Sequence, residues 1–119
     1  MVGRHVIAEV YQVGPELTQD SERLAGLLCE AAGRAGVTVL HCFFHDFEPK
    51  DGLGVAGVTG VIALAESHIS VHTWPEHQYM AIDVFMCGDA DPELVLELLR
   101  ETGLTDMDYK VIHRPFMAH

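Results

Sequence analysis

Basic residues are scarce in this sequence. Its 119 residues include 7 Lys and Arg against 18 Asp and Glu, which gives a formal net charge of −11 and a pI of about 4.9. Nucleic acids and anionic membranes bind clustered positive charge, so this balance argues against both as partners. It is compatible with a cationic small molecule, although a strongly acidic surface is most often simply solvated. No apolar run approaches the roughly 18 residues that a membrane span needs.

Cysteines are few and odd in number. Cys29, Cys42 and Cys87 lie in apolar segments without the spacing of a disulfide framework, and no signal peptide precedes them. We therefore expect reduced thiols and a cytoplasmic protein. The motifs C-x-x-C and H-E-x-x-H are missing, and on a strand His68 and His72 stand about 13 Å apart, too far to share a metal ion. We expect no metal site.

Two other familiar motifs are missing or out of context. The sequence around Ser67 is not G-x-S-x-G, and its extended pattern differs from the strand-to-helix elbow of a hydrolase nucleophile. Residues 52–57 match G-x-G-x-x-G, but they precede a predicted strand instead of opening a helix. We interpret them as a flexible loop rather than a dinucleotide site.

Hydrophobic periodicity organises the chain into one α+β domain. Helices are predicted from a cap at Thr18 or Asp20 to about Ala35, and from Pro92, capped by Asp91, to about residue 102. Strands are predicted over residues 5–11, 37–44, 58–65, 67–73, 79–87 and 109–114. This order favours a two-layer sandwich, a mostly antiparallel sheet with two helices on one face. The other face must be covered, and a second copy of the chain is the simplest candidate.

The stretch of residues 65–76, AESHISVHTWPE, is the most unusual in the chain. It reads as buried strand, yet it holds a concentration of reactive groups: Glu66, Ser67, His68, His72 and Glu76. Buried polar groups cost free energy unless each finds a partner. Chemistry explains this concentration better than folding does.

Three further residues have two interpretations each. Cys87 ends an apolar strand, where it is either a small buried hydrophobe or a proton donor facing a cleft. Phe47 and Trp74 are either core residues or platforms for stacking a planar or cationic group. Because Ser67, His72 and Cys87 fall at strand ends or loops of one sheet, they could converge.

Together these residues resemble the prokaryotic S-adenosylmethionine decarboxylase family, whose members are pyruvoyl enzymes. The resemblance covers nearly the whole chain. It is most specific at Glu66-Ser67-His68 and His72-Thr73-Trp74-Pro75-Glu76, and it includes residues 3–5, 44–47, 57–61, 81–85 and 87–88.

The resemblance implies a self-processing proenzyme. The Ser67 hydroxyl attacks the preceding carbonyl, converts the Glu66–Ser67 amide to an ester, and β-elimination then cleaves the chain. The products are a β chain of residues 1–66 and an α chain of residues 67–119 that begins with a pyruvoyl group. His72 is implied as a base in this processing, and Thr59 as a hydroxyl residue that assists it.

The same resemblance assigns roles in turnover. The pyruvoyl group derived from Ser67 is the implied cofactor; it forms a Schiff base with the substrate's α-amine and serves as an electron sink. Cys87 is the implied proton donor after CO₂ leaves. Phe47 matches a phenylalanine that stacks on adenine, and Glu76 matches a carboxylate that holds the ribose hydroxyls. A homodimer of processed protomers is usual in the family.

The chain departs from the family pattern at the part that reads the nucleoside. Asp46 stands where a basic residue is usual, the link over residues 49–56 is longer, and Met80 and Met86 replace smaller residues flanking the site. An acid at Asp46 could pair with a guanidinium or ammonium group, which would favour L-arginine or L-ornithine as substrate. It could equally be a surface substitution.

Three hypotheses therefore follow, with S-adenosylmethionine in polyamine (spermidine) synthesis ahead of the two amino acids. Retention of Phe47 and Glu76 favours the nucleoside substrate. The third hypothesis is an uncleaved binding or regulatory subunit, and the intact residues Glu66, Ser67, His72 and Cys87 argue against it.

Overall fold

The computed structural model describes residues 2–49 and 54–115. Over these residues six strands form a single sheet in the order β2-β3-β4-β5-β1-β6, with every neighbouring pair antiparallel. The strands are β1 (Val2–Val10), β2 (Val39–Asp46), β3 (Val58–Leu64), β4 (Ser67–Trp74), β5 (Tyr79–Cys87) and β6 (Met107–Pro115).

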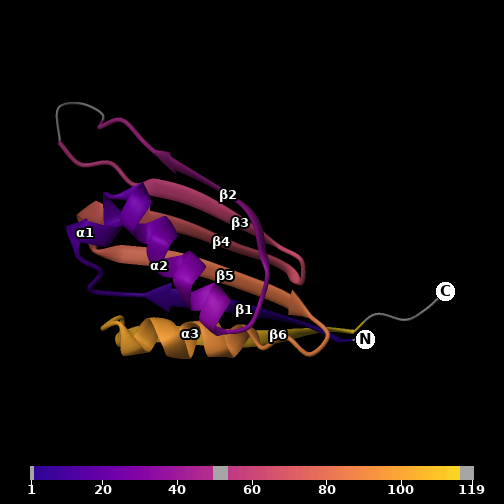
Figure 1. Ribbon diagram of the computed structural model, residues 1–119. Coiled ribbons are helices and arrows are strands. Elements are labelled where there is room, and N and C mark those ends of the chain that lie inside the picture. Colours follow the sequence, from indigo (N-terminus) through magenta and orange to yellow (C-terminus); the bar gives the residue numbers. More distant parts are fainter. Residues whose placement is uncertain (1, 50–53, 116–119) are drawn as a thin grey trace.

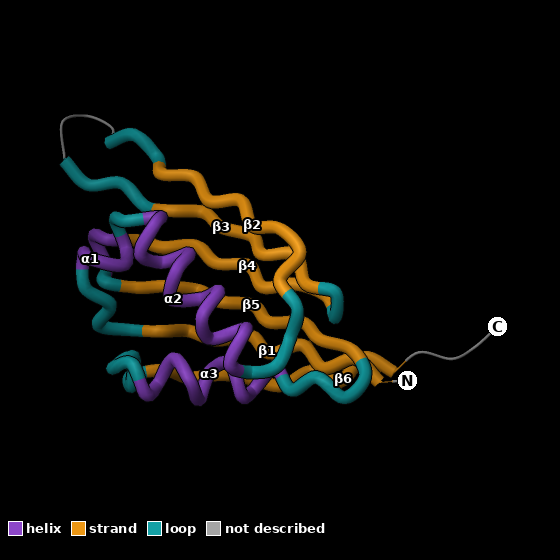
Figure 2. Tube along the Cα trace, viewed as in Figure 1, coloured by secondary structure: helices purple, strands orange, loops and turns teal. Residues whose placement is uncertain are grey.

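Helices α2 (Ser21–Arg34) and α3 (Pro92–Glu101) cover one face of this sheet (Figures 1 and 2). The predicted two-layer α+β architecture is therefore confirmed. A four-residue helix α1 (Pro15–Thr18) and a 3₁₀ turn η1 (Pro75–His77) were not predicted. None of the described helices is long and apolar enough to cross a membrane.

The ends of the two main helices follow their capping residues. Asp20 accepts a hydrogen bond from the backbone N–H of Arg23 at 3.1 Å, so it caps α2, whereas Thr18 belongs to α1. Asp91 accepts from the N–H of Glu93 at 3.0 Å at the start of α3. These side chains satisfy amide groups that the first helical turn leaves free.

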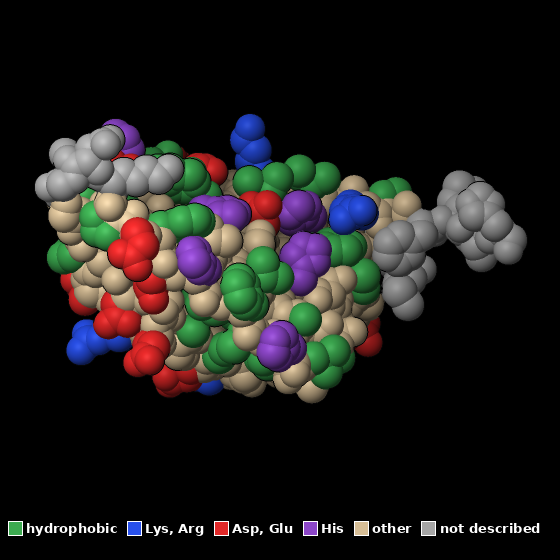
Figure 3. Space-filling model, turned by 90° about the horizontal axis from the view of Figure 1, so that it is seen from above, with side chains coloured by type: hydrophobic (Ala, Val, Ile, Leu, Met, Phe, Trp, Pro, Cys, Tyr) green, Lys and Arg blue, Asp and Glu red, His purple; other side chains and the backbone are tan. Residues whose placement is uncertain are grey.

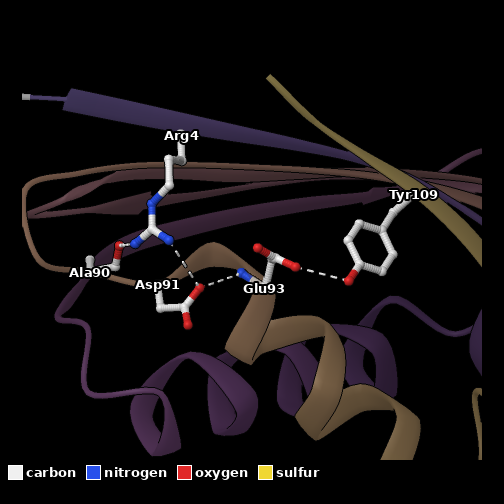
Figure 4. Close-up of polar contacts among 5 residues, drawn as sticks. All are labelled: Arg4, Ala90, Asp91, Glu93 and Tyr109. Carbon is white, nitrogen blue, oxygen red and sulfur yellow. Dashed lines mark hydrogen bonds and ion pairs between the residues drawn. The ribbon is translucent and has the colours of Figure 1, made fainter. Parts of the chain in front are cut away.

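The start of α3 is also tied to the sheet through polar contacts (Figure 4). Arg4 of β1 donates from Nη2 to the carbonyl oxygen of Ala90 at 2.8 Å and pairs with Asp91 at 3.7 Å. Tyr109 of β6 donates from its hydroxyl to Glu93 Oε2 at 2.9 Å. These contacts orient α3 along the β1–β6 side of the sheet.

The core lies between the sheet and the helices, where alternate strand residues meet the apolar helix stripes. Met80 and Met86 of β5 belong to it and are fully buried. Their side chains are on the helix-facing side of β5, and their register partners on β4 are Thr73 and Ser67, so Met86 lies directly beside the predicted cleavage site. Other fully buried members are Val6, Ala8, Val10, Leu24, Leu28, Ile62, Ile69, Ile82, Val84, Val95 and Leu99.

The opposite face of the sheet, here called the open face, is not covered by any described helix. It exposes large apolar side chains at Phe43 (60%), Val61 (43%) and Ile112 (45%). Histidine side chains gather over one region of the surface (Figure 3). The strand register puts five histidines on the open face. Of these, His41, His45 and His72 are exposed, and His5 and His68 are half-buried.

Candidate active site

The Glu66–Ser67 peptide lies in the turn between β3 and β4. Ser67 has a backbone φ of +151°, a region that side-chain-bearing L residues rarely adopt. Its Oγ lies 3.6 Å from Sγ of Cys87, the last residue of β5. The serine that the sequence singled out is therefore strained and adjacent to the predicted proton donor.

Two hydrogen bonds hold Glu66, the residue on the carbonyl side of this peptide, one to its backbone and one to its side chain. Its carbonyl oxygen accepts the backbone N–H of Cys87 at 3.1 Å, and its Oε1 accepts the N–H of Thr38 at 3.0 Å. A cavity of about 450 Å³ borders Glu66 and Cys87 at this end of the sheet, with Asp89 and Asp91 in its wall. An amide N–H aimed at a carbonyl oxygen can stabilise negative charge that develops there.

A second cluster joins β3 and β4 at their other ends. Thr59 Oγ1 lies 3.0 Å from His72 Nδ1, and the two residues are register partners on the open face. The short contact matches the shared role that the resemblance implies for them.

A cavity of about 470 Å³ adjoins this second cluster. Phe47 and Trp74 contribute aromatic walls and are 51% and 39% exposed, and Glu76 from η1 lies in the same lining. Phe47 is fixed through its N–H, which donates to the carbonyl oxygen of Gly57 at 3.0 Å. The predicted substrate-binding residues Phe47 and Glu76 thus meet in one cavity, together with Thr59 and His72.

Gly57 is required by the close approach of the loop to β4. A Cβ at this position would lie 2.2 Å from the carbonyl oxygen of Thr73. Thr73 itself is buried, and its hydroxyl donates to Thr18 at 2.7 Å and accepts from the N–H of Val58 at 2.8 Å. The contacts of Gly57 and Val58 with Thr73 fix the end of the loop that carries Phe47, just before β3.

The two clusters do not meet within one chain. Ser67 and His72 are five residues apart on β4, which corresponds to about 17 Å along an extended strand. Cys87 lies beside Ser67, and Thr59 lies beside His72. Within a single protomer the expected convergence is therefore confirmed for Ser67 and Cys87 and wrong for His72, because β4 runs between opposite ends of the sheet.

Asp46 lies outside the cavity at Phe47. Its two carboxylate oxygens accept the N–H and the hydroxyl of Ser21, at 3.1 and 2.6 Å. It is the register partner of buried Val58, so its side chain is on the helix side of β2. This geometry speaks against the interpretation of Asp46 as a substrate contact. Of the longer loop at 49–56, residues 50–53 lie outside the described residues.

Sequence reasoning missed two residues near the cavity, Tyr79 and Glu9. Tyr79, the first residue of β5, stacks on Trp74, and its hydroxyl donates to Glu9 Oε2 at 2.7 Å. The only available signal was that both positions fall on the open face in the period-two pattern of their strands.

Comparison with known proteins agrees with this arrangement. The family model described as S-adenosylmethionine decarboxylase matches residues 4–115. The chain belongs to the S-adenosylmethionine decarboxylase family. It is 48% identical over 102 residues to an S-adenosylmethionine decarboxylase proenzyme of Parasynechococcus marenigrum, covering 85% of this chain and 75% of the relative. The proenzyme of Carboxydothermus hydrogenoformans is 40% identical over 119 residues, covering 98% and 89%.

A solved structure supports the same assignment at the level of fold. The crystal structure of the adenosylmethionine decarboxylase from Aquifex aeolicus superposes with a TM-score of 0.83 at 32% identity. The match covers 98% of this chain and 93% of the other. The family thus accounts for the sheet, the helices and their order.

Proposed function

We propose that this chain is a self-processing proenzyme whose mature form decarboxylates S-adenosylmethionine by pyruvoyl chemistry. The observation that carries the proposal is the Glu66–Ser67 peptide, with its strained serine and its hydrogen-bonded carbonyl. A φ in this region costs on the order of 1–3 kcal/mol, and cleavage of the peptide relieves that cost. The names of the relatives, which are proenzymes, support the same conclusion.

Processing follows from the groups around this peptide. Ser67 Oγ attacks the Glu66 carbonyl carbon, the C–N bond breaks, and the acyl group moves from nitrogen to oxygen. The Cys87 N–H stabilises the negative charge on the Glu66 oxygen as this happens. A base then removes the Ser67 α-proton, the ester leaves as the Glu66 carboxylate, and hydrolysis of the remaining enamine releases ammonia. The products are residues 1–66 and residues 67–119.

We assign the base to His72 and place it in a second copy of the chain. His72 cannot reach Ser67 of its own chain across about 17 Å of strand. A two-fold axis between two open faces, perpendicular to the strands, would lay the Ser67 end of one copy over the His72 end of the other. The exposed Phe43, Val61 and Ile112 give this face the apolar area that a homodimer would bury.

The residues at Ser67 fit a pyruvoyl group. That group carries a ketone on the former serine carbons and supplies an electron sink for the charge left when CO₂ departs. We assign to Cys87 the donation of the proton that the substrate carbon then needs, and the 3.6 Å distance from its thiol to Ser67 Oγ supports this assignment. All three cysteines are free thiols, and we place the protein in the cytoplasm, where Cys87 stays reduced.

The cavity at Phe47 and Trp74 favours a nucleoside substrate. Aromatic walls suit the stacking of a planar base, and the carboxylate of Glu76 can accept two adjacent ribose hydroxyls. Arginine and ornithine have no ring to stack, and Asp46 is occupied by Ser21 instead of facing the cavity. We therefore choose S-adenosylmethionine over the two amino acids.

The test combines intact mass with CO₂ release. Purified protein should appear as two chains cut between residues 66 and 67, and Ser67→Ala should remain one chain. CO₂ release is then measured in parallel from carboxyl-labelled S-adenosylmethionine, arginine and ornithine. Release from S-adenosylmethionine alone is the expected result. Release only from an amino acid would overturn the substrate, and an intact chain in active preparations would overturn the pyruvoyl chemistry.

A further inference from the structure

Three aromatic rings form a continuous stack beside the cavity at Phe47 and Trp74. Tyr11 follows β1, Tyr79 begins β5 and Trp74 ends β4. The ring centroids of Tyr11 and Tyr79 are 5.7 Å apart with planes at 27°, and those of Tyr79 and Trp74 are 5.3 Å apart at 28°. Offset stacking at such separations is favourable. Trp74 is the member that lines the cavity, so the stack ends at the proposed substrate site.

The middle ring of this stack is held by a hydrogen bond. Tyr79 donates from its hydroxyl to Glu9 Oε2 at 2.7 Å, a charge-assisted contact that links β5 to β1. Burial and this contact raise the pKa of Tyr79 from 10.0 to about 12, so the phenol keeps its proton well into the alkaline range. The backbone is fixed as well, because the N–H of Val13 donates to the carbonyl oxygen of Gln78 at 2.8 Å.

Trp74 itself makes none of the hydrogen bonds found among the described side chains. Trp74 is 39% exposed, and its indole stacks on the ring of Tyr79. Its second ring neighbour is His72, with centroids 6.3 Å apart and ring planes at 52°. Ring orientation therefore depends on the rings beside it, and Tyr79 is the one that is anchored. Binding a planar ligand on a ring already held in place avoids the entropic cost of ordering that ring.

We propose that Tyr79 is a positioning residue for substrate binding, acting through Trp74 with Glu9 as its anchor. The ligand class is a planar heteroaromatic base, which would extend the stack by one member. This inference rests on the proposed function, since it takes Trp74 to be a wall of the substrate site. It predicts that Tyr79 sets the affinity for the base without taking part in bond breaking.

The chain offers a direct probe and a matched control. Trp74 is its single tryptophan, so fluorescence excited at the red edge of the indole band, where tyrosine does not absorb, reports this ring alone. Tyr109 also donates its hydroxyl to a glutamate, Glu93 of α3 at 2.9 Å (Figure 4). Its register partner is the buried Ala8, so it lies on the helix side of the sheet, whereas Trp74 is on the open face. Tyr79→Phe and Tyr109→Phe each remove one tyrosine–glutamate hydrogen bond, partly buried in the first case and exposed in the second, and only the first should disturb the indole.

The variants are compared by Trp74 fluorescence anisotropy and by KM and kcat for S-adenosylmethionine. Tyr79→Phe should lower the anisotropy and raise KM about three- to tenfold, the scale of one hydrogen bond's net contribution, with kcat within about twofold. Glu9→Gln retains an acceptor and should stay near wild type, whereas Glu9→Ala should match Tyr79→Phe. Tyr109→Phe should change neither quantity.

Circular dichroism and thermal unfolding check that each variant is folded. Unchanged anisotropy and KM in folded Tyr79→Phe would overturn the proposal, as would an equal effect of Tyr109→Phe. A kcat loss with unchanged KM would also overturn it, because it would place Tyr79 in the chemistry. If wild-type protein releases no CO₂ from S-adenosylmethionine, the proposed function fails, but anisotropy and fluorescence titration with adenosine still judge the role of Tyr79.

Discussion

The backbone N–H of Cys87 donates a 3.1 Å hydrogen bond to the carbonyl oxygen of Glu66. The thiol of the same residue lies 3.6 Å from Ser67 Oγ. One residue thus presents its amide to the oxygen of the carbonyl group that would be attacked in processing, and its side chain to the serine whose carbons would form the cofactor. The two contacts can be separated by mutation, because every substitution except proline retains the amide.

Cys87→Ala should therefore still be cleaved but should turn over poorly. The amide remains to stabilise the Glu66 oxygen, while loss of the general acid should lower kcat by about 10²- to 10⁴-fold. Intact mass measures the cleavage, and CO₂ release from the cleaved fraction measures turnover. A Cys87→Ala chain that stays uncut would show that the thiol is needed for processing.

Processing should be restored by mixing two inactive variants. Ser67→Ala lacks the nucleophile and His72→Ala lacks the base, so each alone should stay uncut or be cut very slowly. In a heterodimer of the proposed two-fold arrangement, Ser67 of the His72→Ala chain would face His72 of the Ser67→Ala chain, and one complete site would result. Co-expression with tags of different mass should yield cleavage of the His72→Ala chain only.

The control for this experiment is each variant expressed alone, which forms only homodimers. Cleavage of His72→Ala alone at the wild-type rate would remove His72 from processing. Two uncut chains in a purified heterodimer would contradict the assignment of the base to the partner copy, since every group would then be present without effect.

Local patterns in the sequence predicted the elements well. The alternation over residues 79–87 matches β5 residue for residue, and Asp91 with Pro92 marks the start of α3. These signals depend on neighbours along the chain, which is why they can be read from it. The predicted start of β2 was two residues early, and β6 was longer than predicted because it pairs with β1 along its whole length.

The site was harder to predict because it depends on long-range pairing and on strand faces. Asp46 and Phe47 are adjacent, yet the register of β2 sends Asp46 to Ser21 and leaves Phe47 at the cavity. The strained φ of Ser67 has no signal in the residue types around it. The separation of Ser67 and His72 was predictable, because the same 3.3 Å per residue that keeps His68 and His72 apart also applies to them.

Gly57→Ala should destabilise the protein, whereas Gly26→Ala should not. A Cβ at Gly57 meets the backbone oxygen of Thr73, and forcing this contact apart should cost about 1–3 kcal/mol and disturb the loop before β3. A Cβ at Gly26, within α2, meets nothing within 4 Å. Alanine there should add about 0.5–1 kcal/mol through helix propensity. Urea unfolding measures both, and equal stabilities would contradict the close approach.

Asp46→Ala should change stability but not substrate choice. The carboxylate supports the first turn of α2 through Ser21, and loss of such a contact typically costs about 1 kcal/mol. Ser21→Ala removes the hydroxyl half of the contact and serves as the matched variant. Wild type and both variants should have the same KM for S-adenosylmethionine and should release no CO₂ from arginine. A raised KM for S-adenosylmethionine, or release from arginine, in Asp46→Ala alone would return Asp46 to the substrate site.

The Tyr79 hydrogen bond should also appear in the pH dependence of stability. Burial and the contact with Glu9 raise the pKa of Tyr79 to about 12 in the folded chain, against 10.0 for a free tyrosine side chain. Below pH 10 both states keep the phenolic proton and the stabilising contribution is complete. Between pH 10 and 12 the unfolded chain loses the proton first, so the free energy of unfolding falls as pH rises. Tyr79→Phe has no such proton, and its unfolding free energy should fall less steeply over the same window. Urea titrations at about pH 9.5 and about pH 11.5 give the two slopes directly. Parallel slopes for wild type and variant would mean that the Tyr79 phenol ionises alike in both states, which the hydrogen bond to Glu9 does not allow.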